Sequence, residues 1–454
     1  MSDRPETWSG RVGFILATIG SAVGLGSIWK FPYEVGANGG SAFVLFYVVG
    51  LVFIVVPLMF AEFAIGRRGR GDPASSIAAI AAAHGASRGW ALAGVLGVVT
   101  GFLILSFYSV IGGWTIGYAV ETALRGLPGA EPVAVRARFD AFLASPLRMA
   151  AYHLTFIAVT AAIVTRGVAG GIEAASKVLM PILAALMLVL ATYSAVEGDL
   201  AAALRFLLKI DPQYLTAHTA LEALGLGFFS IGVGLGLMIT YAAYGGADIN
   251  LRQVAVVSVA ADTAISFLAG LAVFPIVFAH GLDPASGPGL VFVTLPLAFA
   301  QMPLGTFAAA AFYLLLFIAA LASAISMLEL VVALLMRRFG WQRPVASLIA
   351  AAACFVAGFA TVLSFNRWSD WYPLASMRVL EKSTVYDLLD QLTSNLLLPI
   401  GGFAIALFAG WAVPDRILVE ELRLRPAGAS AMRITLRYIA PAGIAAVALS
   451  SLLA

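Results

Sequence analysis

The stretch Ser21-Ala22-Val23-Gly24-Leu25-Gly26-Ser27 decides the fold, because it places two glycines inside the first long apolar segment, residues 10–36. Glycine lets the backbone leave helical geometry at little steric cost. In hydrocarbon, the freed N–H and C=O groups are tolerated only where protein, ions or substrate satisfy them. The stretch therefore indicates either a broken membrane helix that faces an internal cavity or a close helix crossing through small residues.

A second stretch of the same kind favours the broken helix. Phe228-Phe229-Ser230-Ile231-Gly232-Val233-Gly234-Leu235-Gly236 again interrupts an apolar run with glycines, about half a chain further on. Two interrupted segments in corresponding halves of a chain are typical of an inverted-repeat transporter with its site at the bilayer midplane.

The composition excludes a soluble domain. Of the 454 residues, 61% are hydrophobic and 11% are charged, as in a polytopic membrane protein. The net charge of +3 is spread over many loops, so no nucleic-acid partner is predicted. The single cysteine, Cys354, excludes an intrachain disulfide or a thiolate metal cluster. The first apolar segment lacks a cleavage site and is expected to be retained.

Apolar segments of spanning length predict about eleven transmembrane helices, numbered here helix one to helix eleven. They lie at residues 10–36, 41–66, 90–124, 149–165, 172–195, 220–244, 251–280, 305–336, 344–364, 384–413 and 432–453. Residues 287–303 are short and proline-rich, and we expect an external hairpin that can act as a lid. The chain, 1–454, is interpreted as a single membrane transporter domain. Residues 1–195 form the first inverted repeat, 220–413 the second, and 430–454 an additional helix.

The distribution of arginines predicts the orientation. They gather between helices two and three, eight and nine, and ten and eleven, all on one side, at Arg67, Arg68, Arg70, Arg88, Arg337, Arg338, Arg343, Arg416, Arg423, Arg425 and Arg433. That side is expected to be cytoplasmic. The N-terminus is then cytoplasmic and the C-terminus extracytoplasmic, in a multi-pass protein of a bacterial inner (cell) membrane.

These motifs resemble those of the neurotransmitter:sodium symporters. The resemblance is carried by residues 21–40, 57–62, 177–181, 228–241, 321–326 and 390–395, with Tyr108 and Gly113-Trp114. It covers nearly the whole chain, which is similar in length to the shorter bacterial members. It implies an all-α polytopic membrane protein of about 11 transmembrane helices, with inverted five-helix repeats and broken helices 1 and 6.

The same resemblance implies a function. We expect sodium-coupled symport of small neutral hydrophobic L-amino acids by alternating access, with Leu, Ile, Val or Met ahead of Trp. The alternative is an amino acid transporter of the same fold that is proton-coupled or sodium-independent. The lipid bilayer is the expected setting, and no obligatory protein partner is predicted. An enzyme is not indicated, because His84, His153, His218 and His280 are scattered near helix ends.

The substrate site is implied by the first stretch. N–H groups around Leu25 and Gly26 lie at the positive end of a half-helix, which suits a carboxylate. The resemblance adds the hydroxyl of Tyr108, whose alternative role is packing against a helix carbonyl. Gly24 stands where amine-selective members carry an aspartate. Carbonyls of Ala22, Phe229 and Ser230 are expected to accept the substrate ammonium. The side-chain pocket is expected at Leu25, Ile104, Phe229, Leu235 and Met327, with Gly232 and Ser323 beside it.

One or two sodium ions are expected as cofactors. The family's first site maps to Ala22, Ser27, Ser230 and the substrate carboxylate, with its helix-seven asparagine falling on Ala261. The second site maps to Gly20, Val23, Ala319, Ala322 and Ser323. Ala322 replaces a side-chain oxygen ligand, so the number of ions is left open.

No chloride requirement is expected. Asp262 resembles the helix-seven acid of chloride-independent bacterial members, and Leu226 and Ile265 replace two chloride ligands, although Tyr47 remains. An intramembrane carboxylate is a functional candidate by default. The alternative is an aspartate bonded to serine hydroxyls for structural reasons.

The remaining expectations concern the gates. Glu62 of helix two is expected to satisfy the unwound backbone of helix six. Lys30 and Asp390 resemble an outer ion pair, and Trp8 is expected to plug the inner vestibule. Pro5 and Arg337 replace the partners of the family's inner salt bridge, so that bridge is not expected in its usual form.

Overall fold

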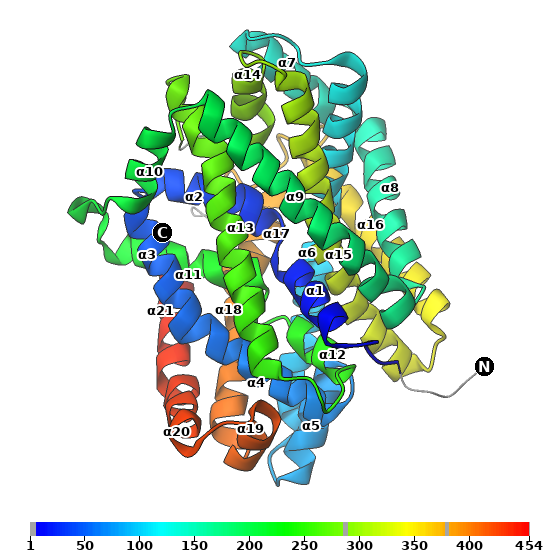
Figure 1. Cartoon of the computed structure of the whole chain (residues 1–454). Coiled ribbons are helices and arrows are strands. Elements are labelled where there is room, and N and C mark those ends of the chain that lie inside the picture. Colours follow the sequence, from blue (N-terminus) through cyan, green and yellow to red (C-terminus); the bar gives the residue numbers. More distant parts are fainter. Residues whose placement is uncertain (1–5, 285–288, 377–380, 454) are drawn as a thin grey trace.

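The computed structural model describes residues 6–284, 289–376 and 381–453, and within these ranges the secondary structure is helical, with turns and loops joining the helices. Figure 1 shows long helices that cross the molecule from one end to the other, with α1 near the centre. The α-helices are α1 (Arg11–Ala22), α2 (Phe31–Ala37), α3 (Ser41–Gly50), α4 (Val56–Gly69), α5 (Pro73–Ala83), α6 (Ala91–Arg125), α7 (Pro132–Leu143), α8 (Pro146–Val164), α9 (Ala174–Glu197), α10 (Leu200–Leu208), α11 (Ala217–Ile231), α12 (Leu237–Ala243), α13 (Leu251–Ala279), α14 (Leu295–Phe299), α15 (Gly305–Phe339), α16 (Arg343–Ser364), α17 (Val385–Asp390), α18 (Leu398–Leu407), α19 (Asp415–Leu422), α20 (Pro426–Ile434) and α21 (Ala440–Leu453).

Short π-helical turns join several of these helices into longer rods. They lie at Gly26–Lys30, Leu51–Val55, Val168–Glu173, Leu290–Thr294, Gln391–Leu397, Phe408–Ala412 and Thr435–Ile439. Among the described residues, nine of the resulting helices are long and apolar enough to cross a membrane. They are Ser41–Gly69, Arg88–Arg125, Pro146–Val164, Val168–Glu197, Leu251–Ala279, Gly305–Phe339, Arg343–Ser364, Val385–Ala412 and Pro426–Ser450.

Two interrupted helices complete the set. The halves of helix one, Arg11–Ala22 and Gly26–Ala37, meet at an angle of 51°. Helix six consists of α11 and α12, which are separated by residues 232–236. Nine continuous helices and two broken ones give eleven, so the predicted count and the predicted breaks are confirmed.

The break in helix six depends on glycine. Gly232, Gly234 and Gly236 adopt φ angles of 71°, 95° and 81°, which lie in the left-handed region that side chains disfavour. Gly232 ends α11, and Gly236 precedes α12. Three such residues in five let the chain leave the helix and re-enter it within the hydrophobic interior.

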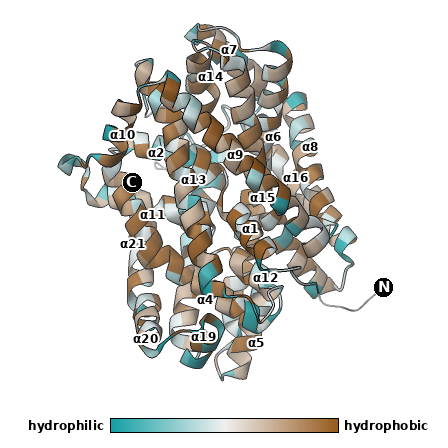
Figure 2. Cartoon of the chain, in the orientation of Figure 1, coloured by the Kyte–Doolittle hydropathy of each residue, from teal (hydrophilic) through white to brown (hydrophobic). Residues whose placement is uncertain are grey.

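The longest helices, α6 and α15, form the centre of the bundle. Each has 35 residues, and they contact one another extensively. Nearly all of the most apolar part of α15 is buried, as expected of a helix that is hydrophobic on every side. Figure 2 shows hydrophobic residues over the middle of the bundle and hydrophilic ones near α19 at one end.

The predicted hairpin at 287–303 is helical from Leu290 to Phe299 and continues as a turn over residues 300–303, and residues 287 and 288 lie outside the described ranges. Phe292 of this segment packs edge-on against Trp29 of helix one, with ring centroids 5.6 Å apart, and against Tyr118 of α6 at 4.9 Å. It also stacks on Tyr313 of α15. The segment therefore covers one end of helices one, three and eight.

Glu62 of α4 meets the break in helix six. Its carboxylate oxygen Oε1 accepts a hydrogen bond of 2.6 Å from the backbone N–H of Gly234, and the Glu62 side chain is fully buried. An unpaired N–H at this depth would cost about 1–3 kcal/mol. Glu62 therefore stabilises the non-helical segment.

Replacing Glu62 tests this role. We expect Glu62→Ala to lower the free energy of unfolding by about 1–3 kcal/mol, because the Gly234 N–H loses its acceptor. Glu62→Gln keeps a carbonyl oxygen and should retain most of the stability. Thermal denaturation in detergent measures both, with the exposed Glu197→Ala as control. Equal denaturation temperatures for Glu62→Ala and Glu197→Ala would contradict the assigned role.

Candidate functional site

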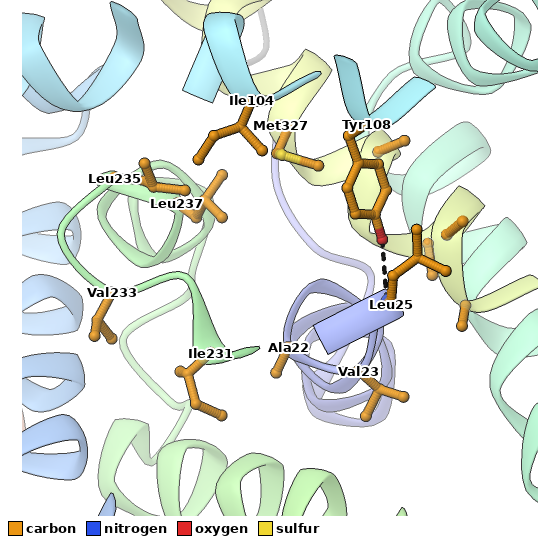
Figure 3. Close-up of a cluster of buried hydrophobic side chains, with 14 of the residues drawn as sticks. Ala22, Val23, Leu25, Ile104, Tyr108, Ile231, Val233, Leu235, Leu237 and Met327 are labelled. Atoms are coloured by element: carbon orange, nitrogen blue, oxygen red, sulfur yellow. Dashed lines mark hydrogen bonds between the residues drawn. The ribbon is translucent and has the colours of Figure 1, made fainter. Parts of the chain in front are cut away.

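The two breaks face one another across a central cavity. Beyond the break in helix one, the backbone N–H of Leu25 donates a hydrogen bond of 3.2 Å to the hydroxyl of Tyr108 on α6. Figure 3 shows the Tyr108 hydroxyl pointing at Leu25, with Ile104 and Met327 beside the ring. A backbone N–H at the start of a half-helix and a hydroxyl thus converge where a carboxylate can be bound.

Gly24 lies against the same hydroxyl. A Cβ atom at Gly24 would be 2.5 Å from Oγ of Ser323 and 3.0 Å from the hydroxyl of Tyr108. No larger side chain fits here unless its neighbours move. The glycine therefore leaves space open between helix one, α6 and α15.

The cavity encloses about 40 Å³ and is lined mostly by apolar side chains. The predicted residues that line it are Gly24, Leu25, Gly26, Ile104, Tyr108, Phe229, Ser230, Gly232, Leu235, Ser323 and Met327. None of the described residues lining it is ionisable at neutral pH. Ala22 is buried next to the break but does not line the cavity.

Four further lining residues escaped the sequence reasoning: Ser21, Leu237, Ser326 and Leu398. Ser21, Leu237 and Ser326 belong to stretches already recognised, so closer attention to those motifs could have found them. Leu398 of α18 carries no signal of its own, because one leucine among many on an apolar helix is not distinctive.

A group of oxygens surrounds Ser323 of α15. Its Oγ lies 3.4 Å from each of the carbonyl oxygens of Gly20, Ser21 and Val23, where helix one ends. Ala322 is buried beside them and offers no side-chain oxygen. Uncharged oxygens at a helix break suit a hard monovalent cation.

A second polar cluster lies between helices one, two, six and seven. Asp262 Oδ1 accepts a hydrogen bond of 2.5 Å from Ser27 Oγ, and its Oδ2 accepts one of 3.0 Å from the hydroxyl of Tyr47. Ser230 Oγ lies 3.2 Å from both carboxylate oxygens and 2.9 Å from Ser27 Oγ. The helix-seven side chain that faces Ser27 and Ser230 is thus Asp262, and the expected assignment of this position to Ala261 was off by one residue.

The predicted outer ion pair is not formed. Lys30 and Asp390 both border a small vestibule outside the cavity, but they do not approach within 4.0 Å. The ammonium of Lys30 instead lies over the ring of Phe229, 4.8 Å from its centroid, and Asp390 accepts a hydrogen bond of 3.0 Å from Ser394. Each charge thus has another partner in this conformation.

The inner side is closed by Trp8. Its indole N–H donates a hydrogen bond of 2.8 Å to the carbonyl of Tyr241, and its ring packs on Phe14 and Tyr241. Directly after it in the chain, Ser9 is held by Glu173, whose Oε2 accepts a hydrogen bond of 2.7 Å from the Ser9 N–H. The N-terminal segment therefore lies across helices one, five and six.

An ion-pair network closes the same side in place of the family's usual inner salt bridge. Arg343, at the start of α16, pairs with Glu6 of the N-terminal segment and with Glu329 of α15, the latter at 2.5 Å. Glu329 is completely buried and also accepts a hydrogen bond of 2.6 Å from Tyr244. We name Glu6, Glu329 and Arg343 the inner clamp.

The inner clamp was not predicted from the sequence, which drew attention to Pro5 and Arg337. Pro5 lies outside the described residues, and Arg337 borders a hollow next to Glu6 without joining the clamp. The charges are reversed relative to the expected bridge, since the carboxylate now lies on the N-terminal segment and the arginine on the helices.

An uncharged cavity between two broken helices, closed on one side by an ion-pair network, defines a membrane transporter with a central binding site. The sequence profile described as the Sodium:neurotransmitter symporter family matches residues 5–134 and 146–376, and the chain belongs to this family. This is a family of transporters, and sodium-coupled transport across a membrane is its function.

Individual relatives agree. The chain is 36% identical over 97% of its length to the uncharacterized sodium-dependent transporter YhdH of Bacillus subtilis (strain 168), covering 96% of that protein. It is 31% identical to an uncharacterized sodium-dependent transporter of Haemophilus influenzae, covering 91% of each chain. It also resembles the crystal structure of MhsT in complex with L-phenylalanine, with a TM-score of 0.89 and 39% identity over 98% of this chain and 99% of that one. The predicted fold class, inverted five-helix repeats included, is confirmed.

The contribution of Glu6 to the inner clamp can be tested by substitution. Glu6→Gln removes one carboxylate from Arg343 and should make opening of the inner side less costly in free energy. Because Glu6 is about one-third exposed, the effect should be about 1 kcal/mol, or about fivefold faster exchange. Hydrogen–deuterium exchange of amides 8–22 in the purified protein measures it.

The control is Arg338→Gln, which changes an exposed arginine of α15 that is not part of the clamp. It should leave the exchange of amides 8–22 unchanged. If Glu6→Gln exchanged at the wild-type rate, Glu6 would have no part in closing the inner side.

Proposed function

We propose that this transporter couples sodium entry to the uptake of neutral hydrophobic L-amino acids by alternating access. The observation that carries the proposal is an uncharged cavity with a carboxylate-binding end, formed by the Leu25 N–H and the Tyr108 hydroxyl. A charged substrate side chain would lose its hydration in this cavity without gaining a partner.

The opposite end of the substrate is proposed to meet backbone carbonyls. Ala22, Phe229 and Ser230 lie at the two helix breaks, where carbonyls freed from helical bonding can accept an ammonium group. Ile104, Leu235 and Met327 then surround the side chain. The phenylalanine bound to MhsT, which shares 39% of its sequence, supports a hydrophobic substrate and extends the class to an aromatic one.

We propose two candidate sodium sites. The second site comprises Gly20, Val23, Ala319 and Ser323, supported by the 3.4 Å distances from Ser323 Oγ to helix-one carbonyls. The first site comprises Ala22, Ser27, Ser230 and the substrate carboxylate, with Asp262 added because its carboxylate contacts both serines. The fixed negative charge of Asp262 would also make chloride unnecessary.

The missing oxygen at Ala322 supports the alternative, a transporter of the same fold that is driven by protons or needs no sodium. The sodium-dependent relatives favour the sodium-coupled form.

The clustered arginines support a cytoplasmic N-terminus and an extracytoplasmic C-terminus. The repeats are proposed to span 1–195 and 220–413.

Competition for labelled leucine tests the substrate class. Leucine, methionine and phenylalanine should compete, whereas lysine, glutamate and decarboxylated amines should not. Gly24→Asp should abolish binding, because its carboxylate would face that of the substrate in a low-dielectric site. Tyr108→Phe should weaken binding about fivefold through loss of one hydroxyl contact.

The matched control is Tyr438→Phe, on the exposed surface of helix eleven, which should bind leucine normally. Strong competition by amines, lysine or glutamate would contradict the proposal. So would normal leucine binding by both Gly24→Asp and Tyr108→Phe.

A sodium titration tests the second site. Leucine binding should rise with sodium and not with potassium, with weak apparent sodium affinity. Ala322→Thr or the smaller Ala322→Ser adds an oxygen and should improve that affinity about fivefold, or about 1 kcal/mol. Ala311→Ser, elsewhere on α15, is the control. Replacing chloride with gluconate should leave leucine binding unchanged. Equal leucine binding in sodium and in potassium would contradict sodium coupling.

A further inference from the structure

A groove on the membrane-facing side of the bundle lies apart from the substrate cavity. It encloses about 650 Å³ between α4, the start of α13 and helix eleven, and we name it the Arg252 groove. Pro57 and Phe60 of α4, Val256 of α13 and Met432 of α20 supply apolar walls. The Val256 side chain is 53% exposed although it lies on a membrane-spanning helix, so this wall faces lipid.

One end of the groove is polar and cationic. Arg252 lies in the first turn of α13, one helical turn before Val256. Its Nε is shielded from solvent, and the part of the chain that the structure describes offers it no hydrogen-bond partner and its guanidinium no ion pair. Neighbouring arginines differ, since Arg67 binds Glu421 and the Ile249 carbonyl, and Arg433 binds the Val413 carbonyl.

The other polar groups at this end also suit an anion. Asn250 caps α13 by accepting a hydrogen bond of 3.3 Å from the Gln253 N–H, and the side chain of Gln253 lines the groove. No carboxylate is present among the described residues that line it. The first turn of a 29-residue helix adds further positive potential. A cation without an ion-pair partner among the described residues, in a groove whose described lining holds no acid, is complementary to a phosphate.

We propose that the Arg252 groove binds one anionic phospholipid. Its phosphate pairs with Arg252 at the mouth, and an acyl chain runs along the wall formed by Phe60, Val256 and Met432. A basic residue at the membrane boundary above an apolar groove matches the two-part chemistry of such a lipid. The lipid then bridges helices two, seven and eleven. A free anion would leave the apolar walls empty, and a sterol would leave Arg252 without a partner.

Native mass spectrometry of the full chain tests the proposal. The protein is reconstituted in nanodiscs of equal parts phosphatidylglycerol and phosphatidylcholine and then released, and the retained lipids are counted. Wild type should keep one phosphatidylglycerol, with a preference of about tenfold over phosphatidylcholine. Arg252→Gln should lose that preference, and Val256→Trp, which fills the groove, should lose the lipid altogether. Arg338→Gln, an exposed arginine outside the groove, is the matched control and should behave as wild type.

Several outcomes would overturn the proposal. Equal retention of phosphatidylglycerol by wild type and Arg252→Gln would mean that Arg252 only extends toward water at the membrane surface. Equal retention of phosphatidylglycerol and phosphatidylcholine by wild type would mean that the charge of the lipid does not contribute to binding. Stabilisation of lipid-free wild type by inorganic phosphate alone, with no retained lipid, would assign the site to a free anion. Displacement of phosphatidylglycerol by cholesteryl hemisuccinate from Arg252→Gln and wild type alike would assign it to a sterol.

Discussion

Backbone groups released inside a membrane must find partners, and the breaks in helices one and six make this constraint central to the protein. The Leu25 N–H meets Tyr108, and the Gly234 N–H meets Glu62. Carbonyls at the end of α1 meet the Ser323 hydroxyl. Each partner comes from a different helix, so the breaks fix how helices two, three and eight are placed. These side chains therefore provide hydrogen-bond partners within the protein for backbone groups at the two breaks.

The same constraint organises the two sides of the site. The Trp8 indole N–H donates a hydrogen bond to the carbonyl of Tyr241 in α12, the second half of helix six, and the inner clamp holds the segment that precedes Trp8. On the outer side, Lys30 and Asp390 are apart. In this structure Trp8 and the inner clamp close one side, whereas the ion pair predicted for the other side is not formed.

The glycine stretches predicted the fold and most of the cavity, because broken helices need glycine at particular positions and the apolar runs set helix lengths. Glu62 and Tyr108 could be assigned through the family resemblance. The inner clamp could not, since Arg343 reaches Glu6 across 337 positions and nothing local distinguishes it from other loop arginines. The predicted pair of Lys30 and Asp390 is not formed in this conformation, because the ammonium of Lys30 lies over the ring of Phe229, a contact that the sequence does not reveal. The helix-seven position that faces Ser27 and Ser230 was assigned to Ala261 instead of Asp262. An error of one residue matters here because neighbouring residues of a helix point about 100° apart.

Uptake of labelled leucine into proteoliposomes tests the central claim most directly. With sodium outside and potassium inside, leucine should accumulate above its external concentration, and a sodium ionophore should abolish the accumulation. Liposomes without the protein set the background. Equal uptake with an inward potassium gradient, or accumulation driven by a proton gradient alone, would contradict sodium coupling and favour the proton-coupled or sodium-independent alternative.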